Sequence, residues 1–144
     1  MAFDVASSPP VPDASESTRF YWDAIADHRL ELLRCQSCGH FVHYPRPVCD
    51  RCLSDDLKPE EISGRGTLYS WCEVMQPSHP YFAERLPYLI GVIDIEEEAG
   101  VRIPTGIVDC RADELRCGAE MEAVFRQAAP GLTLVHFRPV GSAP

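Results

Sequence analysis

Lysine is almost absent from this chain, in which Lys58 is the single lysine among 144 residues. Acidic residues outnumber lysine and arginine by 22 to 13, and the formal net charge at pH 7 is −9. Proteins that bind nucleic-acid phosphates or anionic lipids need clustered positive charge, because neutralising those anions supplies much of their affinity. The composition therefore argues against a nucleic-acid partner and against attachment to a membrane surface.

Long apolar runs are missing as well. The longest candidate, LPYLIGVIDI, meets three consecutive glutamates well before the roughly 20 residues that a membrane span requires. Residues 1–17 contain neither the basic start nor the continuous apolar segment of a secretory signal. With 45% hydrophobic and 24% charged residues, the composition is that of a folded globular chain. We therefore expect a cytoplasmic protein with no membrane partner.

The common sequence motifs of catalysis are absent too. The chain contains no nucleophile elbow, no phosphate-binding glycine loop and no dinucleotide fingerprint. No histidine lies at a spacing that would activate the isolated Cys72, Cys110 or Cys117, so we expect these thiols to pack as small hydrophobes. Glu96–Glu98 fall at a predicted turn, where solvated carboxylates are a simpler interpretation than an acid/base pair. The sequence thus predicts no catalytic residue, and we expect the protein to be inactive alone.

Four of the seven cysteines do form a pattern. Cys35 and Cys38 make one Cys-x-x-Cys pair, and Cys49 and Cys52 make a second pair after ten intervening residues. Zn²⁺ prefers a tetrahedron of soft ligands, and each such turn places two thiolates on one side of it. An odd cysteine count in a reducing compartment argues against a disulfide framework. The pattern therefore predicts one structural Zn²⁺ on these four cysteines, which leave no open position for catalysis.

Alternatives to structural zinc remain open at this point. An iron site or a thiol redox pair would use the same four cysteines, and an iron protein of the rubredoxin type would be coloured. His40 or His43 could replace a cysteine as ligand, but we interpret both as surface or packing residues of a hairpin.

The chain divides into four segments of different character. Residues 1–17 are rich in Pro, Ser and Ala, which predicts a flexible leader. Residues 18–30 have a helical pattern, and residues 31–58, which hold the paired cysteines, suit small hairpins. Residues 59–144 contain short segments rich in β-branched and aromatic residues, which predict a small closed or partly open barrel. The predicted strands are 66–76, 87–97, 101–110, 120–128 and 133–140.

Two segments are candidates for contact with another molecule. The helix carries three consecutive aromatic residues beside the leader, which indicates a docking helix unless it packs on its own core. Its candidate partner-binding residues are Phe20, Tyr21, Trp22 and Ile25. The loop QPSHPYFAERLPY is apolar and stiffened by three prolines, so it offers a surface to a partner or substrate unless it folds back over the barrel. Its candidate residues are His79, Tyr81 and Phe82.

The order of helix, four-cysteine ribbon and barrel resembles the acyl-CoA-associated zinc-ribbon/OB-fold family, formerly domain of unknown function 35. The resemblance covers roughly residues 18–140 and rests on FYWDAIADHRLELLRCQSCG, on YPRPVCDRC, and on GAEMEAVF followed by FRPV. It implies a mainly β protein with an N-terminal helix, a rubredoxin-like zinc ribbon and a C-terminal five-stranded OB-fold barrel. The four paired cysteines match the family's zinc ligands, whereas Met121 stands where a valine is expected.

The resemblance also implies a function. Members typically act as non-catalytic partners of thiolase-like enzymes, so we expect a hetero-oligomer with a thiolase-superfamily protein in which this chain helps to form an acyl-CoA site. One branch assists an aldolase, a lyase that removes a side-chain fragment from a steroid CoA thioester by retro-aldol cleavage. The arginine-rich, lysine-poor composition favours this branch of steroid or lipid metabolism.

Two other functions stay open beside the aldolase complex. A second branch of the family bridges acetoacetyl-CoA thiolase and hydroxymethylglutaryl-CoA synthase. OB folds and zinc ribbons also occur in proteins that bind single-stranded nucleic acid, although the net charge of −6 over residues 59–144 opposes that function here.

Overall fold

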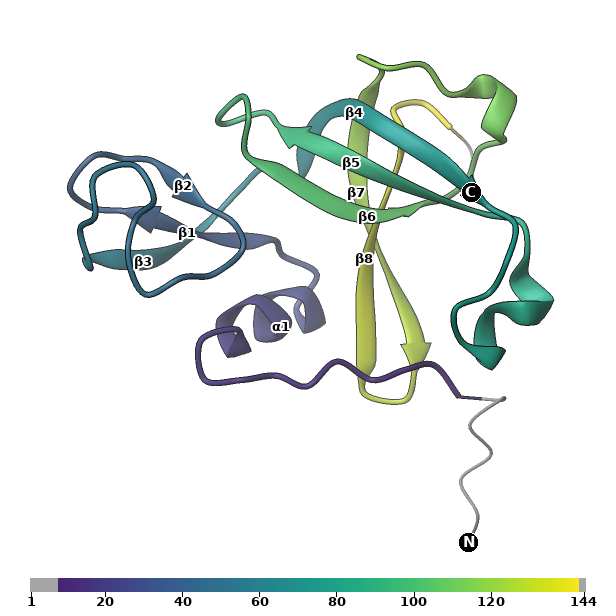
Figure 1. Cartoon of the computed structure of the whole chain (residues 1–144), viewed down its shortest axis with the longest axis horizontal. Coiled ribbons are helices and arrows are strands. Elements are labelled where there is room, and N and C mark those ends of the chain that lie inside the picture. The colour runs from purple at the N-terminus through teal and green to yellow at the C-terminus, as the bar shows by residue number, and fades with distance from the viewer. Residues whose placement is uncertain (1–7, 143–144) are drawn as a thin grey trace, which may run out of the picture.

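The computed structural model describes residues 8–142, and Figure 1 shows their arrangement. The elements are α1 (Arg19–Ala26), β1 (Glu31–Cys35), β2 (Phe41–Val42), β3 (Leu57–Glu61), β4 (Arg65–Val74), the 3-10 helix η1 (Pro80–Arg85), β5 (Tyr88–Ile95), β6 (Arg102–Ile107), the 3-10 helix η2 (Ala112–Glu114), β7 (Glu120–Ala129) and β8 (Leu132–Pro139). The first seven residues of the predicted leader lie outside the described range. Within that range, no helix is long and apolar enough to cross a membrane.

The helix α1 is shorter than the sequence predicted. It ends at Ala26, because His28 adopts a left-handed backbone conformation with φ of 58° and turns the chain toward β1. Thr18 stands at the start of the helix but makes no side-chain capping bond to it. Ala24 and Ile25 are buried, so packing of this face holds the helix in place.

Three antiparallel strands form the sheet of the ribbon, in the order β2-β1-β3. Leu33 in the central strand pairs with Val42 on one side and with Pro59 on the other. Pro59 is tolerated because β3 is an edge strand, where a missing N–H breaks no ladder bond. The sheet continues to Glu61, past the boundary expected at residue 58, and a connection of three residues then leads into the barrel.

The five strands β4 to β8 close into a barrel in the order β4-β5-β6-β8-β7. All neighbouring strands are antiparallel except β6 and β8, which pair in parallel through Gly106 with His136 and Ile107 with Phe137. Pro104 pairs with Val92 of β5 and precedes the short stretch where β8 joins β6, so its missing N–H leaves no ladder bond unmade. The barrel predicted from the strand pattern is thereby confirmed.

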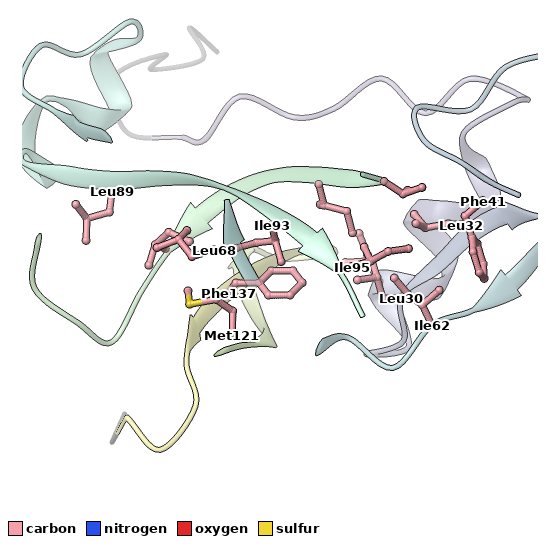
Figure 2. Close-up of a cluster of buried hydrophobic side chains, with 14 of the residues drawn as sticks. Leu30, Leu32, Phe41, Ile62, Leu68, Leu89, Ile93, Ile95, Met121 and Phe137 are labelled. Atoms are coloured by element: carbon pink, nitrogen blue, oxygen red, sulfur yellow. The ribbon is translucent and has the colours of Figure 1, made fainter. Parts of the chain in front are cut away.

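One hydrophobic core runs from the ribbon into the barrel, as Figure 2 shows. Leu30, Leu32 and Ile62 line the ribbon end of this core, and Ile93 and Phe137 fill the barrel. The helix adds Ile25 to the same cluster and contacts both β1 and β8. Because burying one such side chain contributes about 1.5–3 kcal/mol, the three parts stabilise one another through this shared core.

Candidate functional site: a metal centre and its surroundings

Four sulfur atoms gather at one end of the ribbon. Cys35 ends β1, Cys38 follows in the next turn, and Cys49 and Cys52 flank the turn that precedes β3. The four Sγ atoms all lie within 4.8 Å of one another, with 3.5 Å between Cys35 and Cys52 and 3.7 Å between Cys38 and Cys49. A tetrahedral Zn²⁺ with bonds of about 2.3 Å to sulfur requires sulfur–sulfur distances of about 3.8 Å. The donor set therefore fits one structural Zn²⁺, as the sequence predicted.

Few apolar side chains are buried at the cysteine end of the ribbon. Cys35 and Cys49 are buried with Val42 in a small cluster that is separate from the main core, and Cys38 and Cys52 are exposed. A cluster of this size supplies little hydrophobic stabilisation. Structural zinc contributes about 10–16 kcal/mol of apparent binding free energy in small peptides, so the metal dominates the stability of this end.

The backbone around the cysteines favours metal binding. Gly39 has φ of 76°, which glycine adopts without strain, and its N–H donates to the Cys35 carbonyl at 2.8 Å. The backbone N–H of Cys38 lowers the pKa of the Cys35 thiol to about 6. The N–H of Arg51 donates to the Cys49 sulfur at 3.4 Å. Such N–H groups offset the negative charge that four thiolates create around one divalent ion.

A single carboxylate of the barrel joins the two cysteine turns. Glu98, at the tip between β5 and β6, accepts hydrogen bonds from the Phe41 N–H at 2.8 Å and from Arg51 at 2.7 Å. It also lies 2.7 Å from Nδ1 of His40, whose Nε2 is 3.1 Å from Asp50. Although partial burial opposes the charge, the bonds from Phe41 and His40 hold the pKa of Glu98 below its usual range. We call this group of contacts the Glu98 clasp.

The Glu98 clasp corrects one interpretation made from the sequence. Glu98 was expected to be a solvated turn residue, but its side chain is only 20% exposed because the β5–β6 tip reaches the ribbon. Its neighbour Glu97 accepts a hydrogen bond from the Ser63 N–H at 2.5 Å, on the connection between ribbon and barrel. Three adjacent glutamates look alike in a sequence, so no local signal identified these contacts.

Neither histidine of the ribbon belongs to the metal centre. His40 takes part in the Glu98 clasp, and His43 packs between two tyrosines, with ring centroids 6.0 Å from Tyr21 and 4.5 Å from Tyr44. Burial lowers the pKa of His43 to about 4, so its ring is neutral at neutral pH. His43 therefore has the packing role that the sequence indicated, whereas His40 contacts two carboxylates through its two ring nitrogens.

The residues predicted to dock a partner on the helix differ in their accessibility. Ile25 is completely buried in the chain's own core, so it is not available to a partner. Phe20, Tyr21 and Trp22 are half-buried, and Tyr21 and Trp22 pack against that core. Burial raises the pKa of Tyr21 to about 12. The helix is thus docked on its own chain, and only parts of its aromatic side chains face outward.

The loop between β4 and β5 is ordered by its own aromatic residues. Nδ1 of His79 accepts a hydrogen bond from the Tyr81 N–H at 3.2 Å, and Pro80 begins η1. The Phe82 ring lies 5.1 Å from Tyr81 and 5.4 Å from Tyr88 between centroids. His79, Tyr81 and Phe82 therefore form one cluster. This cluster belongs to the barrel and is remote in sequence from the four cysteines.

The isolated cysteines follow the prediction only in part. Cys110 is half-buried against the main core, as expected, but Cys72 and Cys117 are exposed. For Cys72 the reason is a register shift between Leu68 and Ser70, which reverses the alternation of inward and outward residues along β4.

A four-sulfur ribbon joined to a closed five-stranded barrel defines a zinc-ribbon/OB-fold protein with a structural metal. The chain belongs to the DUF35 family and has the two domains of its ChsH2 members. Residues 22–58 match the family model of the rubredoxin-like zinc ribbon domain of ChsH2, and residues 59–126 match that of its C-terminal OB-fold domain.

Known relatives support this assignment over most of the chain. A DUF35 domain-containing scaffold protein of Methanothermobacter thermautotrophicus is 32% identical over 78% of this chain and 84% of that protein. A probable enoyl-CoA hydratase alpha subunit of Thermomonospora curvata is 32% identical over 90% of this chain, which spans only 40% of that longer protein. Among solved structures, a chain of the Ltp2-ChsH2(DUF35) aldolase superposes with a TM-score of 0.80 at 32% identity, over 90% of this chain and 98% of that one.

Proposed function

We propose that this chain is a non-catalytic subunit that assembles with a thiolase-superfamily enzyme and helps to form its acyl-CoA site. The reaction we favour is retro-aldol cleavage of a CoA thioester that carries a steroid or lipid side chain. The observation that carries this proposal is the likeness to a chain of the Ltp2-ChsH2(DUF35) aldolase, at 32% identity over 98% of that chain.

The chemistry of the metal centre is compatible with a subunit that does not catalyse. A retro-aldol cleavage needs a base that removes the hydroxyl proton and a group that stabilises the enolate of the thioester. Four sulfur ligands complete the coordination of Zn²⁺, so the metal has no open position at which it could act as a Lewis acid. We therefore assign the reacting groups to the partner enzyme and a structural role to the zinc.

The surface that meets the partner is also part of the proposal. We assign it to the outward parts of Phe20, Tyr21 and Trp22 and to the neighbouring ribbon, where Tyr44 is 59% exposed and Leu53 is 75% exposed. Large exposed side chains of this kind are common anchors at protein interfaces. Ile25 is left out of this surface because it is buried in the chain's own core.

Affinity capture from native cells tests the proposal. The tagged chain should retain a thiolase-superfamily protein together with zinc, and the tagged Cys35→Ser variant should retain neither. The recovered complex should cleave a β-hydroxyacyl-CoA that neither protein cleaves alone. Recovery of the chain with zinc but without an enzyme, or together with nucleic acid, would overturn the proposal.

A bridging subunit for acetoacetyl-CoA thiolase and hydroxymethylglutaryl-CoA synthase is the second candidate function. It is favoured by the archaeal relatives that are named scaffold proteins. The same capture distinguishes the two functions, because a bridging subunit should retain two different enzymes of the thiolase superfamily and an aldolase subunit should retain one.

A further inference from the structure

The outer face of strands β4, β5 and β6 carries little charge. In β5 the outward residues alternate with buried ones, and they are Tyr88, Ile90, Val92 and Asp94. An antiparallel sheet that packs one face on the core usually presents polar residues on the other face. Here three of the four outward residues are aliphatic or aromatic, in a chain of which 24% is charged. An apolar surface thus stands where a polar one is expected.

The strand register lines up uncharged residues of all three strands in two neighbouring rows. Each row runs from β6 through β5 to β4, with Pro104, Val92 and Ser70 in one and Gly106, Ile90 and Cys72 in the other. Pro104 and Cys72 are exposed, and Ile90 is 38% exposed. Because neighbouring strands lie about 4.8 Å apart, the rows extend about 10 Å across the sheet. We call the surface made by these two rows the β4–β6 face.

A charged pair marks one edge of the β4–β6 face. Nε of Arg102 donates to Asp94 at 3.0 Å, and the guanidinium carbon of Arg102 lies 3.6 Å from the centroid of the Tyr69 ring. The two charges therefore satisfy each other within the chain. Tyr69 is itself 50% exposed, so this edge adds an aromatic side chain to the face rather than an unpaired charge.

The β4–β6 face continues into the partner surface assigned above to the helix and ribbon. A pocket of about 260 Å³ lies between these parts, and its walls include Tyr21, Trp22, Tyr44 and Pro104. Among the three strands of the face, β6 runs nearest to α1 in Figure 1. Pro104 therefore belongs to both surfaces, because it begins one row of the face and lines the pocket beside the aromatic residues of the helix.

The helix and ribbon alone are too small for a stable interface. A standard interface buries about 800 Å² on each partner, which corresponds to about 20–30 residues and a patch roughly 30 Å across. The surface assigned above has only five side chains, namely Phe20, Tyr21, Trp22, Tyr44 and Leu53. A patch of standard size centred on the pocket extends about 15 Å in each direction, so it covers the roughly 10 Å from Pro104 to β4.

We propose that the β4–β6 face binds the same partner enzyme as the helix and ribbon, through an apolar surface of that enzyme. This inference rests on the proposed function, because it names the contact surface for that partner. A face without unpaired charge fits an apolar partner, since neither side then leaves a charge desolvated and unpaired. A second copy of this chain is a poorer occupant, because two copies that each carry a formal net charge of −9 repel one another.

Alkylation of two cysteines in the unmodified protein tests the proposal. Cys72 belongs to the β4–β6 face and Cys117 does not, and both thiols are exposed and lie outside the four-sulfur site. N-ethylmaleimide should modify both in the isolated, zinc-loaded chain. In the captured complex with the thiolase-superfamily enzyme, modification of Cys72 should slow by about tenfold or more, because an interface excludes solvent, while Cys117 stays reactive.

A pair of variants provides a second measurement. Ile90→Glu should weaken binding of the purified enzyme by about 10- to 100-fold, because it places an unpaired carboxylate in the interface. Val140→Glu is the matched control, since Val140 is 42% exposed, follows β8 and lies outside the β4–β6 face. Thermal unfolding of the two isolated variants shows whether their barrels are intact.

The outcomes separate this inference from the proposed function. Capture of the enzyme with Cys72 as reactive as in the isolated chain, or equal binding of the enzyme by the two variants, would overturn the inference and leave the proposed function standing. Failure to capture any thiolase-superfamily enzyme would overturn both. Self-association of the isolated chain with protection of Cys72 would also overturn the inference, because a second copy would then occupy the face.

Discussion

The imidazole of His43 packs between the rings of Tyr21 and Tyr44. Its Nδ1 is buried and has no hydrogen-bond partner within residues 8–142. Its pKa is lowered to about 4 by burial, against an ordinary value of 6.5. A group with a lowered pKa in the folded state stabilises the fold above its ordinary pKa and withdraws that contribution as the pH falls. Between pH 6.5 and about pH 4, His43 takes up a proton more readily in the unfolded chain than in the folded one, so acid favours unfolding.

We predict that His43→Phe makes the stability of the protein less sensitive to acid. Between pH 7 and pH 4 the free energy of unfolding of the variant should fall by about 3 kcal/mol less than that of the unmodified chain. Urea unfolding with zinc present, at several pH values, measures this difference. The zinc ligands are common to both proteins, so their own titration cancels in the comparison, and parallel stability curves would contradict the prediction.

The four cysteine ligands support a second prediction at this scale. Cys52→Ser should remove stoichiometric zinc and melt the ribbon end, because that end has only a small buried cluster beside the metal. Metal analysis of the purified variant and the exchange rates of the ribbon amides provide the readouts. Cys72→Ser is the control, since Cys72 is also exposed but lies outside the four-sulfur site, and it should keep one zinc per chain.

Residues differed in how far the sequence predicted their roles. The four ligands were identifiable because Zn²⁺ imposes both the residue type and the spacing on short turns. The role of Glu98 was not, because its partners His40 and Arg51 are 58 and 47 residues away in the chain.

At the scale of elements, the Glu98 clasp joins the tip between β5 and β6 to both turns of the metal site. We predict that Glu98→Gln speeds the hydrogen exchange of the Phe41 amide by at least tenfold, because a charge-assisted hydrogen bond becomes a neutral one. The zinc content should not change, since none of the ligands is altered. Mass spectrometry or NMR on the zinc-loaded protein can follow this exchange.

Glu96→Gln provides the control for the clasp. Glu96 belongs to the same connection, but its backbone N–H bonds to Arg65 and its side chain has no hydrogen bond or ion pair in the described part of the chain. Equal exchange of the Phe41 amide in the two variants would mean that charge at this tip, rather than the contact itself, protects the ribbon.

The elements of the barrel were more predictable than the helix. Each of the five predicted strands overlaps an observed one, because alternation and bounding Gly or Pro residues are local properties of the sequence. The helix was predicted to extend to residue 30 but ends at Ala26, since the turn at His28 is set by the need to bring Leu30 into the core. The sequence did not predict that the helix packs on β1 and β8. A row of aromatic residues on a helix is equally compatible with packing on the chain's own core and with binding a partner.

For the whole molecule, closure of the barrel depends on one close approach between β6 and β8. A Cβ added to Gly106 would lie 2.7 Å from Cδ2 of His136, its partner in the parallel pair. We predict that Gly106→Ala lowers the free energy of unfolding by about 1–3 kcal/mol through overpacking at this seam. Thermal unfolding of the zinc-loaded chain measures the loss.

A double-mutant cycle shows whether the imidazole is the obstacle. His136→Ala removes the ring, so the Gly106→Ala change should cost clearly less in that background than in the unmodified chain. An identical cost in both backgrounds would place the strain elsewhere in the barrel. The number of barrel strands was predictable from the sequence. The parallel pairing of β6 with β8 was not, because Gly106 and His136 are 30 residues apart and neither strand has a local sequence pattern that indicates its partner.

The order of the elements along the chain also fixes an order in time during translation. The ribbon is complete once residue 61 has emerged, whereas β8, which closes the barrel and contacts α1, is the last of the strands to be made. At about 5–20 residues per second, the ribosome needs roughly 4–16 s to make the intervening segment. The ribbon can thus capture its ion while the nascent barrel is still open, and zinc shortage would act on newly made chains before it reached finished ones.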